Sequence, residues 1–354
     1  MNKYVKRYCI DAMSGMAQGL FASLLIGTII KTLGQQLLRL AAGNPVFEFL
    51  VSVGAFASDP HVVGAAMAIG IGFAMKVDAF VLLSLAAVGS AANVSGGAGG
   101  PLAVLIIAIV AAEVGMLVSK KTKVDLIVTP GVTIIVGVLL TVLTAKYIGI
   151  AASSVGKFLV WTTKLHPFWM GILVSVVVGV ALTLPISSAA ICAAFGLTGL
   201  AGGAAVAGCC AQMVGFAVMS YRENKMGGLL AQGIGTSMLQ MSNIVKNPRI
   251  WIPPTLAAAI TGPIATCLFK MEMNGAAVSS GMGTCGFVGQ IGVITGWFEP
   301  SEVALGHGAV AMMPGFVDWL GLILVCFVLP GVLSWAFGLL LRKIGWIKEG
   351  DLTL

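Results

Sequence analysis

Apolar residues form long runs along most of the chain, and polar residues are confined to short breaks between them. The clearest runs lie at residues 12–30, 101–118, 124–145, 168–185, 252–269 and 320–341. Several of them approach the roughly 20 residues that a helix needs to cross the hydrocarbon core of a bilayer. The pattern predicts an all-α polytopic membrane protein with about ten transmembrane helices, allowing for apolar stretches that are too short or broken to cross.

The composition supports a membrane protein. Of the 354 residues, 58% are hydrophobic and only 9% are charged, whereas soluble domains have about 45–50% apolar and about 25% charged residues. The net charge is +7, and the basic residues cluster at the N-terminus, in 119–123, around 246–249 and in 342–348. We interpret this distribution as a sign of membrane topology and not of nucleic-acid binding. Cytoplasmic loops carry such an excess, so we expect both termini in the cytoplasm and an even number of spans.

The first 30 residues resemble a signal peptide, but their apolar run is too long and no small-residue cleavage site follows closely. We expect a retained first span. The seven cysteines show no metal-ligand spacing, and the adjacent Cys209 and Cys210 lie in a small-residue helix, which favours buried free thiols. The sequence indicates no metal site, no cofactor and no catalytic centre.

An internal repeat is predicted from self-comparison. Residues 44–60 resemble residues 166–185, and the shared Leu-Val-Ser-Val begins at Leu50 and again at Leu173. Later matches keep the same order, including Gly99-Gly100 with Gly227-Gly228. The predicted organisation is an N-terminal span (1–43), two repeat units (44–165 and 166–288), and a partial third unit with the C-terminal span (289–354).

A weaker alignment pairs residues 156–168 with 289–301. It makes Asn44, His166 and Glu299 equivalent, each a polar residue directly before proline. Transporters built from repeats bind substrate near the bilayer midplane where the repeats meet. We therefore expect these three side chains to lie in related places near the substrate.

Two glycine-rich stretches, 89–101 and 279–292, are poor candidates for continuous helices, because each glycine costs roughly 1 kcal/mol in a helix. Non-helical backbone persists at membrane depth only where protein buries it or water lines it. Re-entrant hairpins fit this requirement, but close helix packing through small residues fits as well. Both alternatives stay open for 89–101, and a hairpin is favoured for 279–292.

Four ionisable residues stand at breaks in the apolar sequence beside proline or glycine: His166, Glu299, Glu302 and His307. A proline shifts the preceding residue out of helical geometry, which fixes His166 and Glu299 at chain bends. A carboxylate there accepts several hydroxyl hydrogen bonds, as recognition of a polyol requires. We expect Glu299 to lie in a cavity within reach of His166 or His307; the alternative is a solvated loop.

The Glu-Pro of "GWFEP", the histidine before proline and the stretch "NPRIWIPPTLAAAITGPIATCLF" resemble the membrane IIC subunit of bacterial sugar phosphotransferase systems. The stand-alone IIC-like group that includes the perfringolysin-regulator-like proteins is most similar. The resemblance implies a homodimeric inner-membrane permease with re-entrant hairpins and an elevator-like motion. It also implies that Glu299 binds sugar hydroxyls, with His166 near the phosphorylated position. Trp297 and Phe298 depart from the family motif.

A permease component for a small polar, sugar-like solute is thus the leading prediction, with separate IIA and IIB proteins as its predicted partners. One alternative is a proton-coupled secondary transporter that uses His166 or Glu299 as its proton site. Another is a membrane-embedded regulator that senses a ligand. Because the breaks between the spans are short, the regulator would have little cytoplasmic surface for output.

Overall fold

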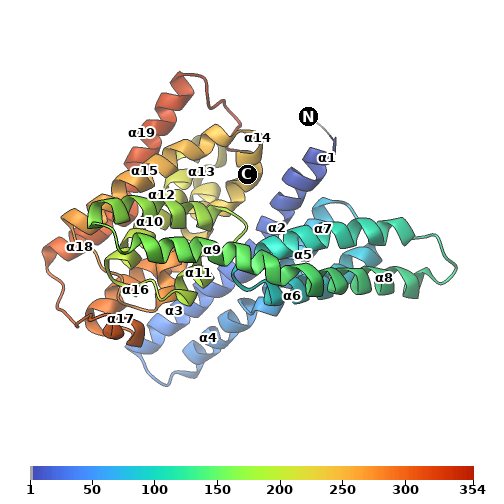
Figure 1. Ribbon diagram of the computed structural model, residues 1–354, viewed down its shortest axis with the longest axis horizontal. Coiled ribbons are helices and arrows are strands. Elements are labelled where there is room, and N and C mark those ends of the chain that lie inside the picture. Colours follow the sequence, from blue (N-terminus) through green and yellow to red (C-terminus); the bar gives the residue numbers. More distant parts are fainter. Residues whose placement is uncertain (1–2) are drawn as a thin grey trace. The chain divides into compact units, whose positions relative to one another are not determined.

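The structure is a computed structural model that describes residues 3–354, and it consists of helices joined by short connections (Figure 1). The first two residues of the predicted N-terminal span lie outside the described part. Within that part the only extended pairing is an isolated bridge between Gly199 and Met273. The chain divides into two compact units, Met1–Ala152 and Ser153–Leu354.

The first unit begins with a long helix and its antiparallel partner. The helix runs without a break over Lys3–Leu40 and comprises α1 (Lys3–Val5), η1 (Lys6–Asp11), α2 (Ala12–Leu20), η2 (Phe21–Leu25) and α3 (Ile26–Leu40). Its partner is the pair α4 (Pro45–Ala57) and α5 (Pro60–Ala74), which is bent by 53°. Gly15 packs against the backbone of Gly70, and Gly34 packs against Val51, so the two stretches run in opposite directions.

The next stretch, Ala79–Val118, folds back on itself. It contains α6 (Ala79–Gly96), the short turn η3 (Gly97–Gly99) and α7 (Gly100–Val118). Val81 lies against Gly115, whereas a continuous helix would separate these residues by about 50 Å at 1.5 Å per residue. The chain reverses at Gly97, which has a φ of +51°, a value that glycine adopts without steric cost.

For 89–101 the structure shows a reversal between two helices at Gly97 and close helix packing at Gly89, whereas a re-entrant hairpin at membrane depth stays a prediction. Gly89 remains helical and packs against the backbone of Gly64 on α5, as close packing through small residues requires. The turn is confined to 97–99. After it, α8 (Asp125–Leu140), η4 (Thr141–Ala145) and α9 (Lys146–Thr162) form one long helix, of which α8 and η4 pack against α6.

The second unit is built around four packed helices: α10 (Pro167–Thr183), α12 (Gly199–Met219), α15 (Ile252–Pro263) and α19 (Leu329–Lys343). Gly179 meets the backbone of Gly208, and Gly171 meets that of Gly262, so both contacts bring backbones together without side chains between them. The buried Ser175 Oγ donates a hydrogen bond to the Ala258 carbonyl at 2.7 Å. These small residues explain how α10 packs closely against both α12 and α15.

Shorter elements surround these four helices. They are α11 (Ser188–Ala194), α13 (Tyr221–Leu230), η5 (Ala231–Gly235), η6 (Ser237–Gln240), α14 (Met241–Lys246), η7 (Pro248–Trp251), η8 (Ile264–Leu268), η9 (Ala277–Gly281), η10 (Cys285–Phe287), α16 (Val288–Phe298), α17 (Glu302–Gly306), α18 (Phe316–Ile323) and η11 (Leu324–Val328).

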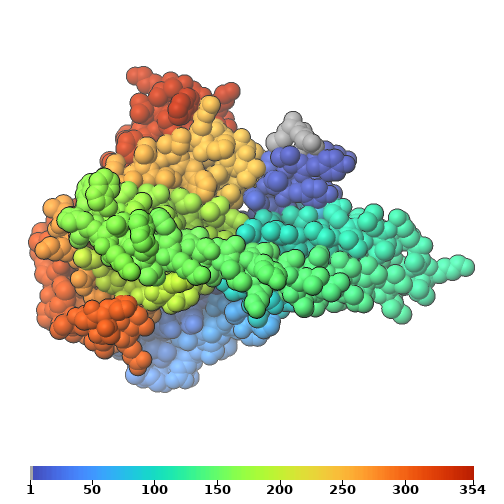
Figure 2. Space-filling view, in the orientation of Figure 1, coloured from blue at the N-terminus to red at the C-terminus, as the bar shows by residue number. Residues whose placement is uncertain are grey.

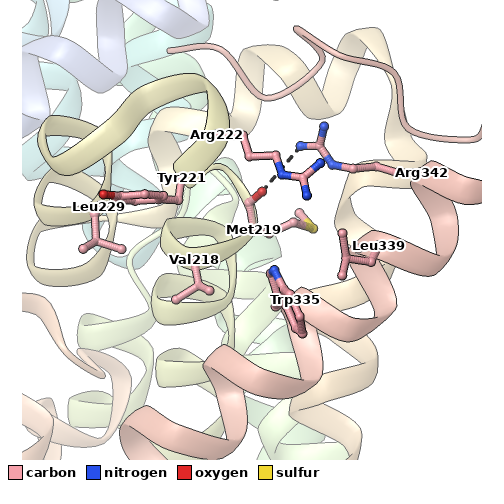
Figure 3. Close-up of a pocket in the computed structure, with 9 residues that line it drawn as sticks. Val218, Met219, Tyr221, Arg222, Leu229, Trp335, Leu339 and Arg342 are labelled. Atoms are coloured by element: carbon pink, nitrogen blue, oxygen red, sulfur yellow. Dashed lines mark hydrogen bonds between the residues drawn. The ribbon is translucent and has the colours of Figure 1, made fainter.

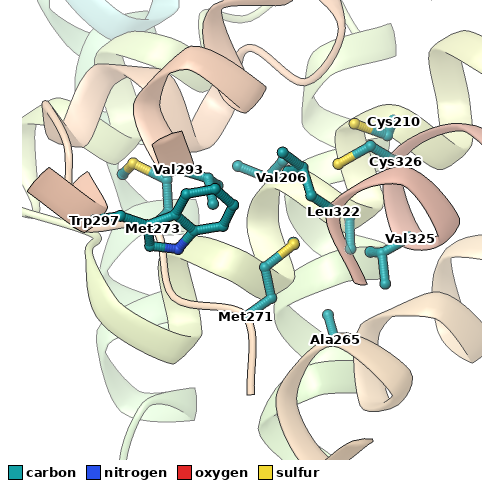
Figure 4. Close-up of a cluster of buried hydrophobic side chains, with 11 residues drawn as sticks. Val206, Cys210, Ala265, Met271, Met273, Val293, Trp297, Leu322, Val325 and Cys326 are labelled. Carbon is teal, nitrogen blue, oxygen red and sulfur yellow. The ribbon is translucent and has the colours of Figure 1, made fainter. Parts of the chain in front are cut away.

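A buried apolar cluster joins α12, α16 and η11 in this unit (Figure 4). Trp297 is 5% exposed within the cluster and packs edge-to-face on Trp319, with ring centroids 4.9 Å apart. Aromatic pairs favour this geometry. Trp297, one of the two residues that depart from the family motif, is thus a core residue that anchors the end of α16.

Six helical stretches are long and apolar enough to cross a membrane, or seven if the bent pair α4–α5 is one span. The six are Lys3–Leu40, Ala79–Val118, Asp125–Thr162, Gly199–Met219, Pro248–Leu268 and Phe316–Lys343. Large apolar side chains are exposed on α8, where Ile127 is 74% and Ile135 is 68% exposed; Figure 2 shows this part of the chain in green on the surface. Such surface is typical of contact with lipid. The predicted total of ten spans stays a prediction. Ala79–Val118 is counted once among the six stretches, although it contains the two antiparallel helices α6 and α7.

The internal repeat also stays a prediction. Gly99 and Gly100 stand where the turn η3 meets α7, whereas Gly227 and Gly228 lie within α13, so the two pairs occupy different kinds of structure. The boundary between the compact units follows Ala152, about a dozen residues before the predicted boundary at 165/166.

Candidate functional site

Two of the predicted site residues, Asn44 and His166, begin helices. The Asn44 carboxamide oxygen accepts a hydrogen bond from the Val46 amide at 3.0 Å, and His166 Nδ1 accepts one from the Phe168 amide at 3.4 Å. In each case proline occupies the first helical position, where its missing N–H costs nothing. The shared pattern of a polar residue before proline is thus a helix start, which Asp59-Pro60 and Asn247-Pro248 also show.

Glu299 lies at the opposite kind of position. Its backbone amide donates to the Thr295 carbonyl at 2.7 Å and ends α16, and Ser301 then begins α17. The side chain of Glu299 is exposed and does not line the cavity described below, so its place at a substrate site stays a prediction. The sequence alignment of Glu299 with Asn44 and His166 therefore pairs a residue that ends a helix with two residues that begin helices.

Glu302 and His307 lie at the two ends of the short helix α17, and both are exposed. His307 follows the helix as its C-cap, and its Nδ1 lies 3.0 Å from the hydroxyl oxygen of Thr198. This contact links residues that are far apart in the sequence. His307 also lines a cavity.

The cavity beside His307, the His307 cavity, has a volume of about 450 Å³, within the range of small-molecule sites. Its polar side chains are His307, Thr198 and Thr163, and its remaining walls are largely apolar, including Phe195, Leu197 and Met170. Leu165 and Pro167 also line it, so His166 lies between two lining residues without lining the cavity itself.

The predicted break in 279–292 is confirmed as non-helical backbone. Gly283 and Gly286 have φ values of +53° and +52°, and Phe287 has +58°. The left-handed conformation is uncommon for a residue with a bulky side chain. Residues 279–281 and 283–286 are nevertheless buried, so protein covers this irregular backbone as the membrane requires.

Two serine hydrogen bonds join this broken segment to α11 and to the loop that follows α11. Ser188 Oγ donates to the Gly281 carbonyl at 2.7 Å, and Ser280 Oγ donates to the Leu197 carbonyl at 2.6 Å. Each serine thereby supplies a buried carbonyl with a partner that a regular helix would have provided. We call these two bonds the serine clasp. Because Leu197 lines the cavity, the bond from Ser280 holds part of the cavity wall.

Sequence reasoning missed a buried polar network next to this clasp. The Gln212 side chain accepts from Trp251 Nε1 at 3.0 Å and donates to Thr255 at 3.2 Å. Thr183 and Ser237 are also joined by a hydrogen bond of 2.8 Å. A signal was available: Gln212 is a lone amide in a helix of small apolar residues, and intramembrane polar residues are functional candidates.

Among residues 3–354, no group of three or more His, Cys, Asp or Glu side chains could hold a metal ion. The His307 cavity offers hydroxyl groups, an imidazole and backbone polar groups. Such groups exchange hydrogen bonds with a hydroxylated solute and do not require a cofactor.

The family model "Phosphotransferase system, EIIC" matches residues 10–354. The chain belongs to this family. A search of the curated proteins finds no match. As an EIIC chain with long apolar helices, it is an integral membrane protein and a permease component of a phosphotransferase system, and it works with IIA and IIB proteins.

Proposed function

We propose that this EIIC chain moves a sugar-like solute and that the solute binds in the His307 cavity. The observation that carries the proposal is the contact between His307 and Thr198 at the wall of a cavity backed by buried, non-helical backbone. Non-helical segments in membrane transporters expose backbone polar groups toward their substrates.

The chemistry of the cavity suits a polyol. The Thr198 hydroxyl donates and accepts hydrogen bonds, and the imidazole of His307 does either according to its tautomer. The apolar walls contributed by Phe195, Leu197 and Met170 fit the C–H faces of a sugar ring. A few polar groups in an apolar cavity are the usual composition of a small-molecule site.

The other predicted residues take different roles in this proposal. Glu299 and Glu302 lie in the connection that carries His307, so a movement of this connection would bring their carboxylates toward the solute. His166 stands between two lining residues and would approach the solute by a change of rotamer. Asn44 caps α4, and we assign it to that cap.

We also propose that the protein is a homodimer of the bacterial inner membrane with both termini in the cytoplasm. The clusters of basic residues at 119–123, 246–249 and 342–348 support this orientation. The IIA and IIB proteins would then reach the cytoplasmic face and transfer the phosphoryl group to the solute.

The test is a binding screen of monosaccharides and disaccharides on the purified protein, read by thermal shift and followed by isothermal titration. We expect His307→Gln to weaken binding of the best sugar about tenfold, the effect of losing one or two good hydrogen bonds. His61→Gln is the matched control, because His61 is an exposed histidine on α5 that bonds to Ser90. Equal loss in both variants, or none in His307→Gln, would remove the cavity from the proposal.

A further inference from the structure

A second feature of the EIIC chain lies where α12 and α19 end, and the proposed sugar site does not use it. A groove with a volume of about 340 Å³ runs between these helices (Figure 3). Its walls are the apolar side chains of Val218, Leu229, Trp335 and Leu339, and its polar end carries Arg222 and Arg342. Both helices belong to stretches long and apolar enough to cross the membrane.

The two arginines do not have matching negative partners. Arg342 pairs with Glu223 at 2.6 Å and also donates to the Met219 carbonyl at 3.4 Å. Arg222 is exposed, and its guanidinium has no ion pair or hydrogen bond among residues 3–354. Both arginines line the groove and are labelled in Figure 3, and the ion pair of Glu223 with Arg342 leaves Arg222 without a carboxylate partner among residues 3–354.

A second cavity of about 480 Å³ shares Arg222 and Arg342 with the groove. It adds Lys348 and Glu349, whose charges offset each other. The uncompensated charge therefore remains at Arg222. An anion bound in the groove would balance this charge, and guanidinium binds phosphate with two parallel hydrogen bonds.

The apolar walls point to a ligand that also has a hydrocarbon part. Trp335 is 50% exposed, and tryptophan is enriched at the level of the lipid headgroups. Arg342 stands in the last turn of α19, and Arg222 stands in α13 just after α12 ends. Basic pockets between transmembrane helices bind anionic headgroups. A free phosphate would use the arginines but would leave the apolar groove empty.

We propose that this groove binds an anionic glycerophospholipid. Its phosphate lies between Arg222 and Arg342, and one acyl chain follows the groove along Trp335 and Leu339. The site is separate from the His307 cavity, so the proposal holds whether or not a sugar is the transported solute.

The experiment is native mass spectrometry of the purified protein titrated with phosphatidylglycerol, and with phosphatidylcholine of the same acyl chains. We expect phosphatidylglycerol to bind more tightly to the wild type, and Arg222→Gln to weaken that binding about fivefold. Lys343→Gln is the matched control: it removes the same charge from an exposed residue beside Arg342 that lines neither cavity. Arg222 is the residue to change, because Arg342→Gln would leave Glu223 buried without its partner.

Three outcomes would overturn the proposal. The first is equal affinity for the two lipids, and the second is equal weakening in Arg222→Gln and Lys343→Gln. The third is full competition by glycerol 3-phosphate at concentrations similar to those of the lipid, which would show a site for soluble anions. An unchanged thermal unfolding midpoint of lipid-free Arg222→Gln would show that the loss of binding is not a loss of fold.

Discussion

The carboxylate of Asp78 lies 2.6 Å from Lys120 Nζ and 2.8 Å from the Ser119 hydroxyl. Asp78 precedes α6, and Lys120 follows α7. The two contacts therefore join the ends of the antiparallel pair at the side opposite its turn. The hydrogen bond from Lys120, followed by that from Ser119, lowers the pKa of Asp78 below its usual value.

This lowered pKa predicts a pH dependence of stability. Because the carboxylate is favoured in the folded state, its contribution is present above the unfolded pKa of about 3.9 and is lost as the pH falls through the folded value. We expect Asp78→Asn to lower the thermal unfolding midpoint slightly at pH 7. The difference from wild type should shrink as the pH falls through the folded pKa, because Asp78 is then protonated in both states. A difference that persists at low pH would assign the effect to packing.

The ion pair between Glu223 and Arg342 is more enclosed, with side chains 5% and 15% exposed. Glu223 Oε2 has no hydrogen-bond partner. Arg342→Gln should reduce the free energy of unfolding by about 3 kcal/mol, because it leaves a buried carboxylate unpaired. The double variant Glu223→Leu/Arg342→Met should recover most of this loss. SDS titration in mixed micelles measures the free energy of unfolding of both variants. A double variant as unstable as Arg342→Gln would contradict the explanation.

The crossing of α5 and α6 depends on Gly64 and Gly89. A Cβ atom on Gly64 would overlap the carbonyl oxygen of Gly89, so Gly64→Ala should cost about 1–3 kcal/mol through forced backbone movement. Gly131→Ala on α8 is the control, because its Cβ would meet open space. That variant should gain up to about 1 kcal/mol from helix propensity. Similar unfolding free energies for the two variants would refute this role of Gly64.

The serine clasp predicts a structural effect at the proposed sugar site. Ser280→Ala would leave the buried Leu197 carbonyl without its 2.6 Å partner and should cost about 1–2 kcal/mol. It should also weaken solute binding, since Leu197 lines the His307 cavity. Ser52→Ala, at an exposed serine of α4, should change stability by less than about 0.5 kcal/mol. Unaltered binding and stability in Ser280→Ala would show that the cavity wall does not need the clasp.

Residues 346–354 are docked on the second unit through buried contacts. The Leu352 side chain is fully buried, and its carbonyl accepts hydrogen bonds from Asn224 and Gln240 at 2.8 and 2.9 Å. Leu352→Ala should destabilise the unit by about 2–5 kcal/mol. Leu354→Ala is the control because that side chain is 49% exposed, and it should be nearly neutral. Protease resistance of the segment, followed over time, measures the docking; equal cleavage of the two variants would count against it.

Much of the architecture could be predicted from the sequence because it depends on local properties. The length and apolarity of the runs indicate membrane helices without knowledge of their partners. The glycines of 279–292 indicated a break, and the structure has left-handed backbone at Gly283 and Gly286. The family resemblance carried by 247–269 and by Glu299-Pro300 is confirmed by the match over residues 10–354.

The tertiary structure alone decided which polar residues meet. A residue before proline has the same local sequence whether a helix starts there, as at His166, or has just ended, as at Glu299. Gly97 and Gly89 stand in similar glycine-rich sequence, yet Gly97 forms a turn and Gly89 is helical. The tertiary contact that distinguishes Gly89 is its packing against Gly64. The contact between His307 and Thr198, like the groove at Arg222, joins segments distant in the chain. Such contacts depend on how helices pack, because close approach of two backbones is a property of the pair and of neither sequence alone.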